Sequence, residues 1–87
     1  MDIQDRVIAI LARQALVDPS AVRLDMSPED LGLDSLGMME AIFAIEESFD
    51  VSVPFDMAEP GASGFDTGSV AALVRAVEDL VAGARSA

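Results

Sequence analysis

Ser35 is the residue whose setting offers the clearest chemistry in this sequence, because it stands between Asp34 and Leu36 in a chain without histidine, cysteine, lysine or tyrosine. Those absences remove the usual general bases and most nucleophilic side chains, so we do not expect the chain to be an enzyme. A serine that nothing in its own chain activates can still accept a group from another enzyme. We therefore interpret Ser35 as a candidate point of covalent attachment.

The same serine also has a structural interpretation, since Asp34 or Ser35 could cap the start of a helix. A capping box does not support this interpretation, because Gly37 and Met38 occupy the positions where glutamate or glutamine would be needed. A phosphodiester on Ser35 would lie at the positive end of that helix, which favours an anion by about 0.3 to 1 kcal/mol. The nearby carboxylates oppose a freely bound phosphate, so a covalent link is the better hypothesis.

Two helices and a long loop are expected to position this serine. The spacing of Ile3, Val7 and Leu11 predicts a first helix over residues 3–16. Residues 17–34 contain two prolines and predict a long ordered loop with room for one short helical turn. A second helix is predicted over residues 35–48, with a broad apolar stripe of Leu36, Met39, Ile42, Phe43, Ile45 and Phe49.

The C-terminal part of the sequence predicts one more long helix. Residues 49–54 alternate apolar and polar, but a lone strand would have no partner, so we expect none. Residues 55–68 contain three glycines and a proline that limit any further helix to one or two turns at 56–59. The last helix is expected to be capped by Thr67 or Ser69 and to end at Gly83. Its predicted buried stripe consists of Val70, Leu73, Val74, Val77, Leu80 and Val81. The predicted fold is all-α: a small three- to four-helix bundle with a long loop between the first and second helices, forming a single domain over residues 1–87.

Composition limits the partners of this domain. The net charge is −11, and eleven of the sixteen acidic residues lie between Arg23 and Arg75, where there is no basic residue. A surface this acidic repels nucleic acid and attracts basic protein surfaces. No apolar stretch approaches the length of a membrane span, no signal-like segment opens the sequence and no calcium-loop spacing occurs. We expect a cytoplasmic monomer without a metal.

Two stretches together resemble the acyl carrier protein family of phosphopantetheine-binding carriers. Residues 31–36 read Leu-Gly-Leu-Asp-Ser-Leu, and residues 46–54 read Glu-Glu-Ser-Phe-Asp-Val-Ser-Val-Pro. The resemblance implies that Ser35 carries a covalent 4'-phosphopantetheine arm, derived from coenzyme A and attached by a phosphopantetheinyl transferase. It further implies that the arm holds acyl groups as thioesters for enzymes of fatty-acid or specialised lipid biosynthesis.

The resemblance also implies a docking surface for enzymes with basic patches. It assigns contacts with the transferase or with acyl-transferring enzymes to seven residues, of which Met39 and Phe43 also fit the core stripe: Asp34, Leu36, Met39, Glu40, Phe43, Glu46 and Glu47. Ala41 and Ala44 could leave space for a sheltered acyl chain, although we slightly favour ordinary close helix packing as their role.

Two departures from the family pattern indicate a specialised rather than a housekeeping member. Gly37 stands where an acidic residue is usual, and residues 55–68 are longer and richer in glycine than expected. One alternative within the family is an aminoacyl, peptidyl or polyketide carrier of secondary metabolism. An alternative outside it is an unmodified acidic interaction module that binds a basic helix through Met38, Met39 and Phe43.

Overall fold

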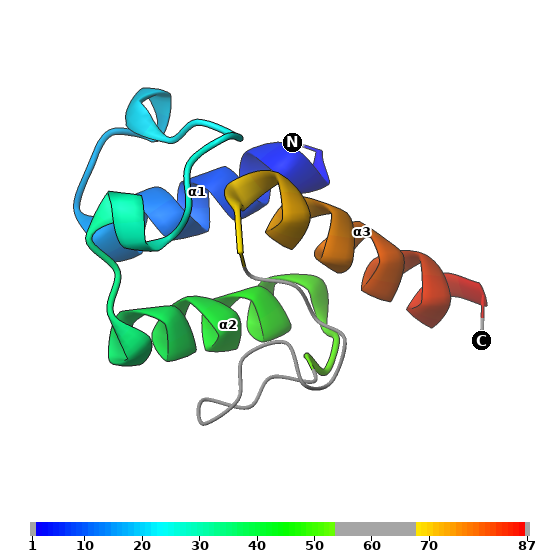
Figure 1. Ribbon diagram of the computed structural model, residues 1–87. Helices are drawn as coiled ribbons and strands as arrows, with labels where there is room; N and C mark the ends of the chain where they lie inside the picture. Colours follow the sequence, from blue (N-terminus) through cyan, green and yellow to red (C-terminus); the bar gives the residue numbers. More distant parts are fainter. Residues whose placement is uncertain (1, 54–67, 87) are drawn as a thin grey trace.

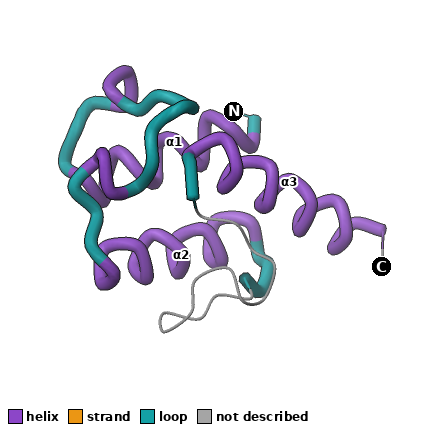
Figure 2. Tube along the Cα trace, viewed as in Figure 1, coloured by secondary structure: helices purple, strands orange, loops and turns teal. Residues whose placement is uncertain are grey.

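The computed structural model describes residues 2–53 and 68–86, and this part of the protein contains helices and loops but no strand. The elements are α1 (Ile3–Ala15), the short 3-10 helices η1 (Pro19–Ala21) and η2 (Glu29–Leu31), α2 (Ser35–Phe49) and α3 (Val70–Ser86). α1 and α2 lie side by side and run in opposite directions, while α3 crosses them and extends beyond the pair (Figures 1 and 2). The all-α prediction is confirmed, including the long loop between the first two long helices.

Local hydrogen bonds define both ends of α1. Asp2 Oδ1 accepts the Asp5 N–H at 2.8 Å, which caps the helix N-terminus. Val7, Leu11 and Ala12 are buried on the inner face. At the other end the chain turns through Leu16, whose backbone is left-handed with φ 58°.

α2 buries a different face from the one predicted. Met38, Ala41, Ile42 and Ile45 are its buried residues, at the i, i+3, i+4, i+7 spacing of one helical face. Of the predicted stripe, Ile42 and Ile45 are buried, whereas Leu36 and Phe43, which were also assigned to partner contacts, are 58% and 55% exposed. The stripe was too broad because apolar residues surround most of α2, and hydropathy alone does not select the inner face.

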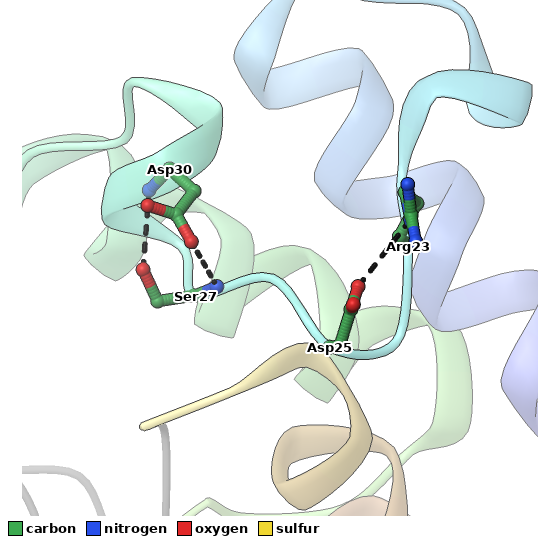
Figure 3. A network of polar contacts seen from close by, with 4 residues as sticks. All are labelled: Arg23, Asp25, Ser27 and Asp30. Carbon is green, nitrogen blue, oxygen red and sulfur yellow. Dashed lines mark hydrogen bonds and ion pairs between the residues drawn. The ribbon is translucent and has the colours of Figure 1, made fainter.

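The loop between α1 and α2 is held to the body of the protein. Ser27 and Asp30 exchange hydrogen bonds around the start of η2, and Arg23 pairs with Asp25 at 3.4 Å in exposed loop (Figure 3). The first amides of α3 donate to the same loop, from Val70 N to Met26 O at 2.7 Å and from Ala71 N to Leu24 O at 3.0 Å. The loop thus satisfies helix N–H groups that would otherwise lack partners.

α3 supplies the third side of the core. Its buried residues Val70, Leu73, Val74, Val77 and Val81 all belong to the predicted stripe. Ser69 is confirmed as a cap, because its hydroxyl accepts the Ala72 N–H at 3.0 Å.

The predicted end of α3 at Gly83 is wrong, because the helix continues to Ser86. A glycine inside a helix costs only about 1 kcal/mol relative to alanine, which one position can absorb. The short helix predicted at 56–59 lies outside the described residues. Within those residues, no helix is long and apolar enough to cross a membrane.

Candidate attachment site

A tight reversal after η2 delivers the chain to the start of α2. Gly32 has φ 84°, a left-handed conformation that glycine adopts without a steric penalty. The amides of Gly32 and Leu33 donate back to Glu29 O at 2.9 Å and to Pro28 O at 3.0 Å. Leu33 is only 7% exposed and anchors the turn in the core. The next two residues, Asp34 and Ser35, are therefore presented from a fixed backbone.

Asp34, and not Ser35, caps α2. Asp34 Oδ1 accepts the Gly37 N–H at 2.7 Å, and Asp34 O accepts the Met38 N–H at 2.8 Å. Ser35 occupies the first helical position, is exposed, and its hydroxyl forms no hydrogen bond within the described residues. Because the cap is made by its neighbour, the Ser35 hydroxyl remains available for reaction.

Gly37 contributes to this arrangement through the space it leaves empty. A Cβ atom at position 37 would lie 3.2 Å from Asp34 Oδ1 and 3.3 Å from Leu33 Cδ2. Either the capping carboxylate or the anchoring leucine would have to shift to admit a side chain. Sequence reasoning treated Gly37 as a missing docking charge and overlooked this close approach, which becomes visible only when the turn is folded.

The seven predicted contact residues do not share one environment. Leu36, Glu40, Phe43 and Glu47 are exposed and recur at three- or four-residue steps, so they follow one outer face of α2. Met39 is half-buried beside that face, and Asp34 is exposed at its start. The exposure of Phe43 favours the contact interpretation over the core interpretation.

Glu46 departs from the exposed position expected of a docking acid. It is half-buried, and its Oε2 accepts the Val53 N–H at 2.9 Å. This carboxylate supports the chain leaving α2. Met38, which was assigned to the surface of the alternative interaction module, is only 6% exposed and belongs to the core.

The small residues of α2 are engaged in close packing. Ala41 is fully buried and Ala44 is half-buried among the helices. A surface hollow of about 400 Å³ lies instead at the end of α2 away from Ser35, beside Arg6, Phe49, Glu78 and Val81. No group of three metal-ligating side chains occurs in the part of the chain that the structure describes.

Comparison with known proteins identifies the family of the chain. The family model described as "Phosphopantetheine attachment site" matches residues 5–77. An acyl carrier protein of Sulfurovum sp. is 42% identical over 60 residues, which cover 68% of this chain and 80% of that protein. An acyl carrier protein of Campylobacter jejuni subsp. doylei is 45% identical over 56 residues, covering 63% of this chain and 73% of that protein.

These matches define a class of protein that carries a prosthetic group instead of catalysing a reaction. The chain belongs to the acyl carrier protein family and contains its phosphopantetheine attachment domain. The residues present fit the group, because the serine hydroxyl at this helix N-terminus is exposed and accepts or donates no hydrogen bond within residues 2–53 and 68–86.

Proposed function

We propose that Ser35 carries the 4'-phosphopantetheine arm and that the protein delivers acyl thioesters to enzymes of fatty-acid or specialised lipid biosynthesis. The observation that carries the proposal is the division of roles at the start of α2. Asp34 accepts the amide hydrogen bond of the cap, and the neighbouring Ser35 hydroxyl is exposed and has no hydrogen-bond partner among the residues that the structure describes. We place the protein in the cytoplasm as a monomer.

The chain contributes an acceptor atom and the transferase contributes the catalytic groups. Ser35 Oγ forms a bond to a phosphorus of the coenzyme A diphosphate, its proton passes to the transferase, and the adenosine-containing phosphate leaves. The helix dipole and the amides at the start of α2 favour the resulting phosphodiester anion. The bound arm supplies the thiol that forms thioesters, and this fits a chain that has no cysteine.

Partner enzymes are proposed to dock on the outer face of α2. Leu36 and Phe43 offer exposed apolar area, while Glu40 and Glu47 offer charge to basic patches. Met39 lies at the edge of the same face and can adapt to several partners. Asp34 lies beside the acceptor serine, and Glu46 is a weaker contributor because its carboxylate already accepts the Val53 N–H.

Intact mass spectrometry after coexpression with phosphopantetheinyl transferases tests the attachment site. We expect the wild type to gain the mass of one 4'-phosphopantetheinyl group and Ser35→Ala to gain none. Ser20→Ala is the matched control, because Ser20 is a second exposed serine that lies close to an aspartate and its loss should leave loading intact. Equal mass gain in Ser35→Ala would overturn the assignment.

The two alternatives predict different results in the same measurements. An unmodified acidic interaction module would show no mass gain with any transferase. An aminoacyl, peptidyl or polyketide carrier would gain the arm but hold a different cargo. Release and identification of the thioester-bound group from protein isolated from its native host distinguishes that carrier from one that serves lipid biosynthesis.

A further inference from the structure

Leu16 occupies a left-handed position at the end of α1 with its side chain exposed, and neither feature favours leucine. It is one of two non-glycine residues with positive φ among the described residues, at 58°. Its side chain is 91% exposed, so the unfavourable left-handed backbone is not offset by burial. The Leu16 and Val17 amides close the helix on Arg13 O at 3.4 Å and Ala12 O at 3.0 Å, a motif in which glycine is usual at position 16.

The other left-handed residue, Asp50, provides an internal comparison. It follows α2 with φ 54°, and the next amide, from Val51, donates to Glu46 O at 3.2 Å in the same type of closure. Aspartate tolerates this conformation better than leucine does. Val51 also packs half-buried against the core, whereas Val17 is 37% exposed. The turn after α1 therefore exposes two apolar residues, whereas the one apolar residue in the turn after α2 is half-buried.

The exposed pair lies at the same end of the protein as Ser35. Since α1 and α2 are antiparallel neighbours, the C-terminus of α1 and the N-terminus of α2 are at one end of the helix pair (Figures 1 and 2). Packed helices have axes about 8 to 10 Å apart. A standard interface covers about 800 Å² of each partner, so an enzyme whose active site reaches Ser35 is wide enough to cover the end of α1 as well.

We propose that Leu16 and Val17 form an apolar anchor for the phosphopantetheinyl transferase, separate from the docking face of α2. This inference rests on the proposed function of Ser35. The complementary surface on the transferase is an apolar depression with a cationic group at its edge, because exposed Asp18 adjoins the anchor. Exposed aspartates are ionised at neutral pH, and hydrogen bonds from the Ser20 amide and hydroxyl lower the pKa of Asp18 further.

The variant Leu16→Gly distinguishes a role of Leu16 in transferase docking from a role in protein stability. Leu16→Gly should keep or raise the melting temperature, because the left-handed strain is removed. It should lower kcat/KM for loading from coenzyme A by about tenfold, mainly because KM rises. A tenfold change is the size of effect typical of a truncated anchor residue. Asparagine also tolerates the left-handed region, so Leu16→Asn should lower kcat/KM for loading as much as Leu16→Gly does.

Asp50→Gly is the matched control at the opposite end of the helix pair. It relieves the same type of backbone conformation and should load at the wild-type rate. Wild-type kcat/KM in Leu16→Gly would overturn the anchor, as would an equal loss in Asp50→Gly, which would indicate a general effect of flexibility. If the wild type itself is not loaded by any transferase, the proposed function fails instead.

Discussion

The two ends of the α1–α2 pair are held together by different kinds of contact. At the loading end, defined as residues 16–18 and 29–37, the side-chain hydrogen bonds of the loop and of Asp34 span at most three residues. At the tied end, defined as Arg6, Ser48, Phe49 and the pair Glu46–Val53, they span seven residues between Glu46 and Val53 and 42 residues between Arg6 and Ser48. Arg6 donates to Ser48 O at 2.5 Å and to Ser48 Oγ at 2.7 Å, and its guanidinium lies 4.4 Å from the Phe49 ring centroid.

The contacts that stabilise the packing of α1 on α2 and the exposed residues around Ser35 therefore lie at opposite ends of the helix pair. The Arg6 guanidinium donates to the Ser48 carbonyl in the last turn of α2 and so links α1 to α2. A positive charge is favourable there, because the C-terminus is the negative end of the helix dipole. At the loading end the local bonds shape the backbone without covering Ser35, Leu16 or Leu36, all of which remain exposed. Among the described residues, the side-chain hydrogen bonds that join α1 to α2 therefore lie at the tied end and leave Ser35 uncovered.

The largest expected effect comes from breaking the tied end. Arg6→Ala should lower the free energy of unfolding by about 2 kcal/mol, because it removes charge-assisted hydrogen bonds and the contact with Phe49. Urea denaturation measures the change. Arg23→Ala is the control, since its exposed pair with Asp25 is worth at most about 1 kcal/mol. Loading of folded Arg6→Ala should match the wild type, and a selective loss of loading would contradict the division between the two ends.

A smaller effect is expected at the loading end from Asp34. Asp34→Ala should cost about 1 kcal/mol through loss of the cap, whereas Asp34→Asn should retain most of the stability because asparagine caps nearly as well. Both variants should load more slowly if the transferase recognises the carboxylate charge. Chemical denaturation and loading kinetics on the same samples separate the two roles. Equal destabilisation by alanine and asparagine would argue against the capping role.

The Gly37→Ala substitution tests how tightly the turn at the loading end is packed, because it adds a side chain there. Gly37→Ala should stabilise an ordinary helix site by up to about 1 kcal/mol. Here we expect that gain to be largely cancelled, because the new Cβ would lie within 3.3 Å of Leu33 and Asp34 side-chain atoms. Gly83→Ala is the matched control, since nothing lies within 4 Å of its Cβ position and the full gain should appear. Equal stabilisation of both variants in urea would show that the turn relaxes freely.

The smallest effect distinguishes Glu46 from Glu47. Glu46→Gln weakens the bond to Val53 N and should cost about 0.5 kcal/mol, while Glu47→Gln should leave stability unchanged within that margin. Association with a basic partner enzyme at low salt should weaken more for Glu47→Gln, because Glu47 is the exposed charge. The opposite ranking in a binding titration would return Glu46 to the docking surface.

Much of the helix pattern could be predicted because its signals are local. The first and second long helices begin at the predicted residues, and the buried stripe of α3 follows its predicted spacing. The inner face of α2 could not be predicted in the same way, since exchange of Met38 for Leu36 or Phe43 scarcely changes the hydropathy of the helix. The end of α3 was misplaced because a single glycine is a weak stop signal.

The sequence by itself determined that Ser35 opens a helix behind an aspartate, and that the chain lacks a thiol and the usual general bases of its own. These properties depend on composition and on contacts between near neighbours. Only the tertiary structure decided which α2 residues face a partner, and that Arg6 joins a segment 42 residues away. It also placed the C-terminus of α1, which Leu16 caps, at the same end of the helix pair as the N-terminus of α2, where Ser35 lies (Figure 1). Such outcomes depend on how the helices pack, because hydropathy spacing identifies an apolar helix but not the neighbour it will meet.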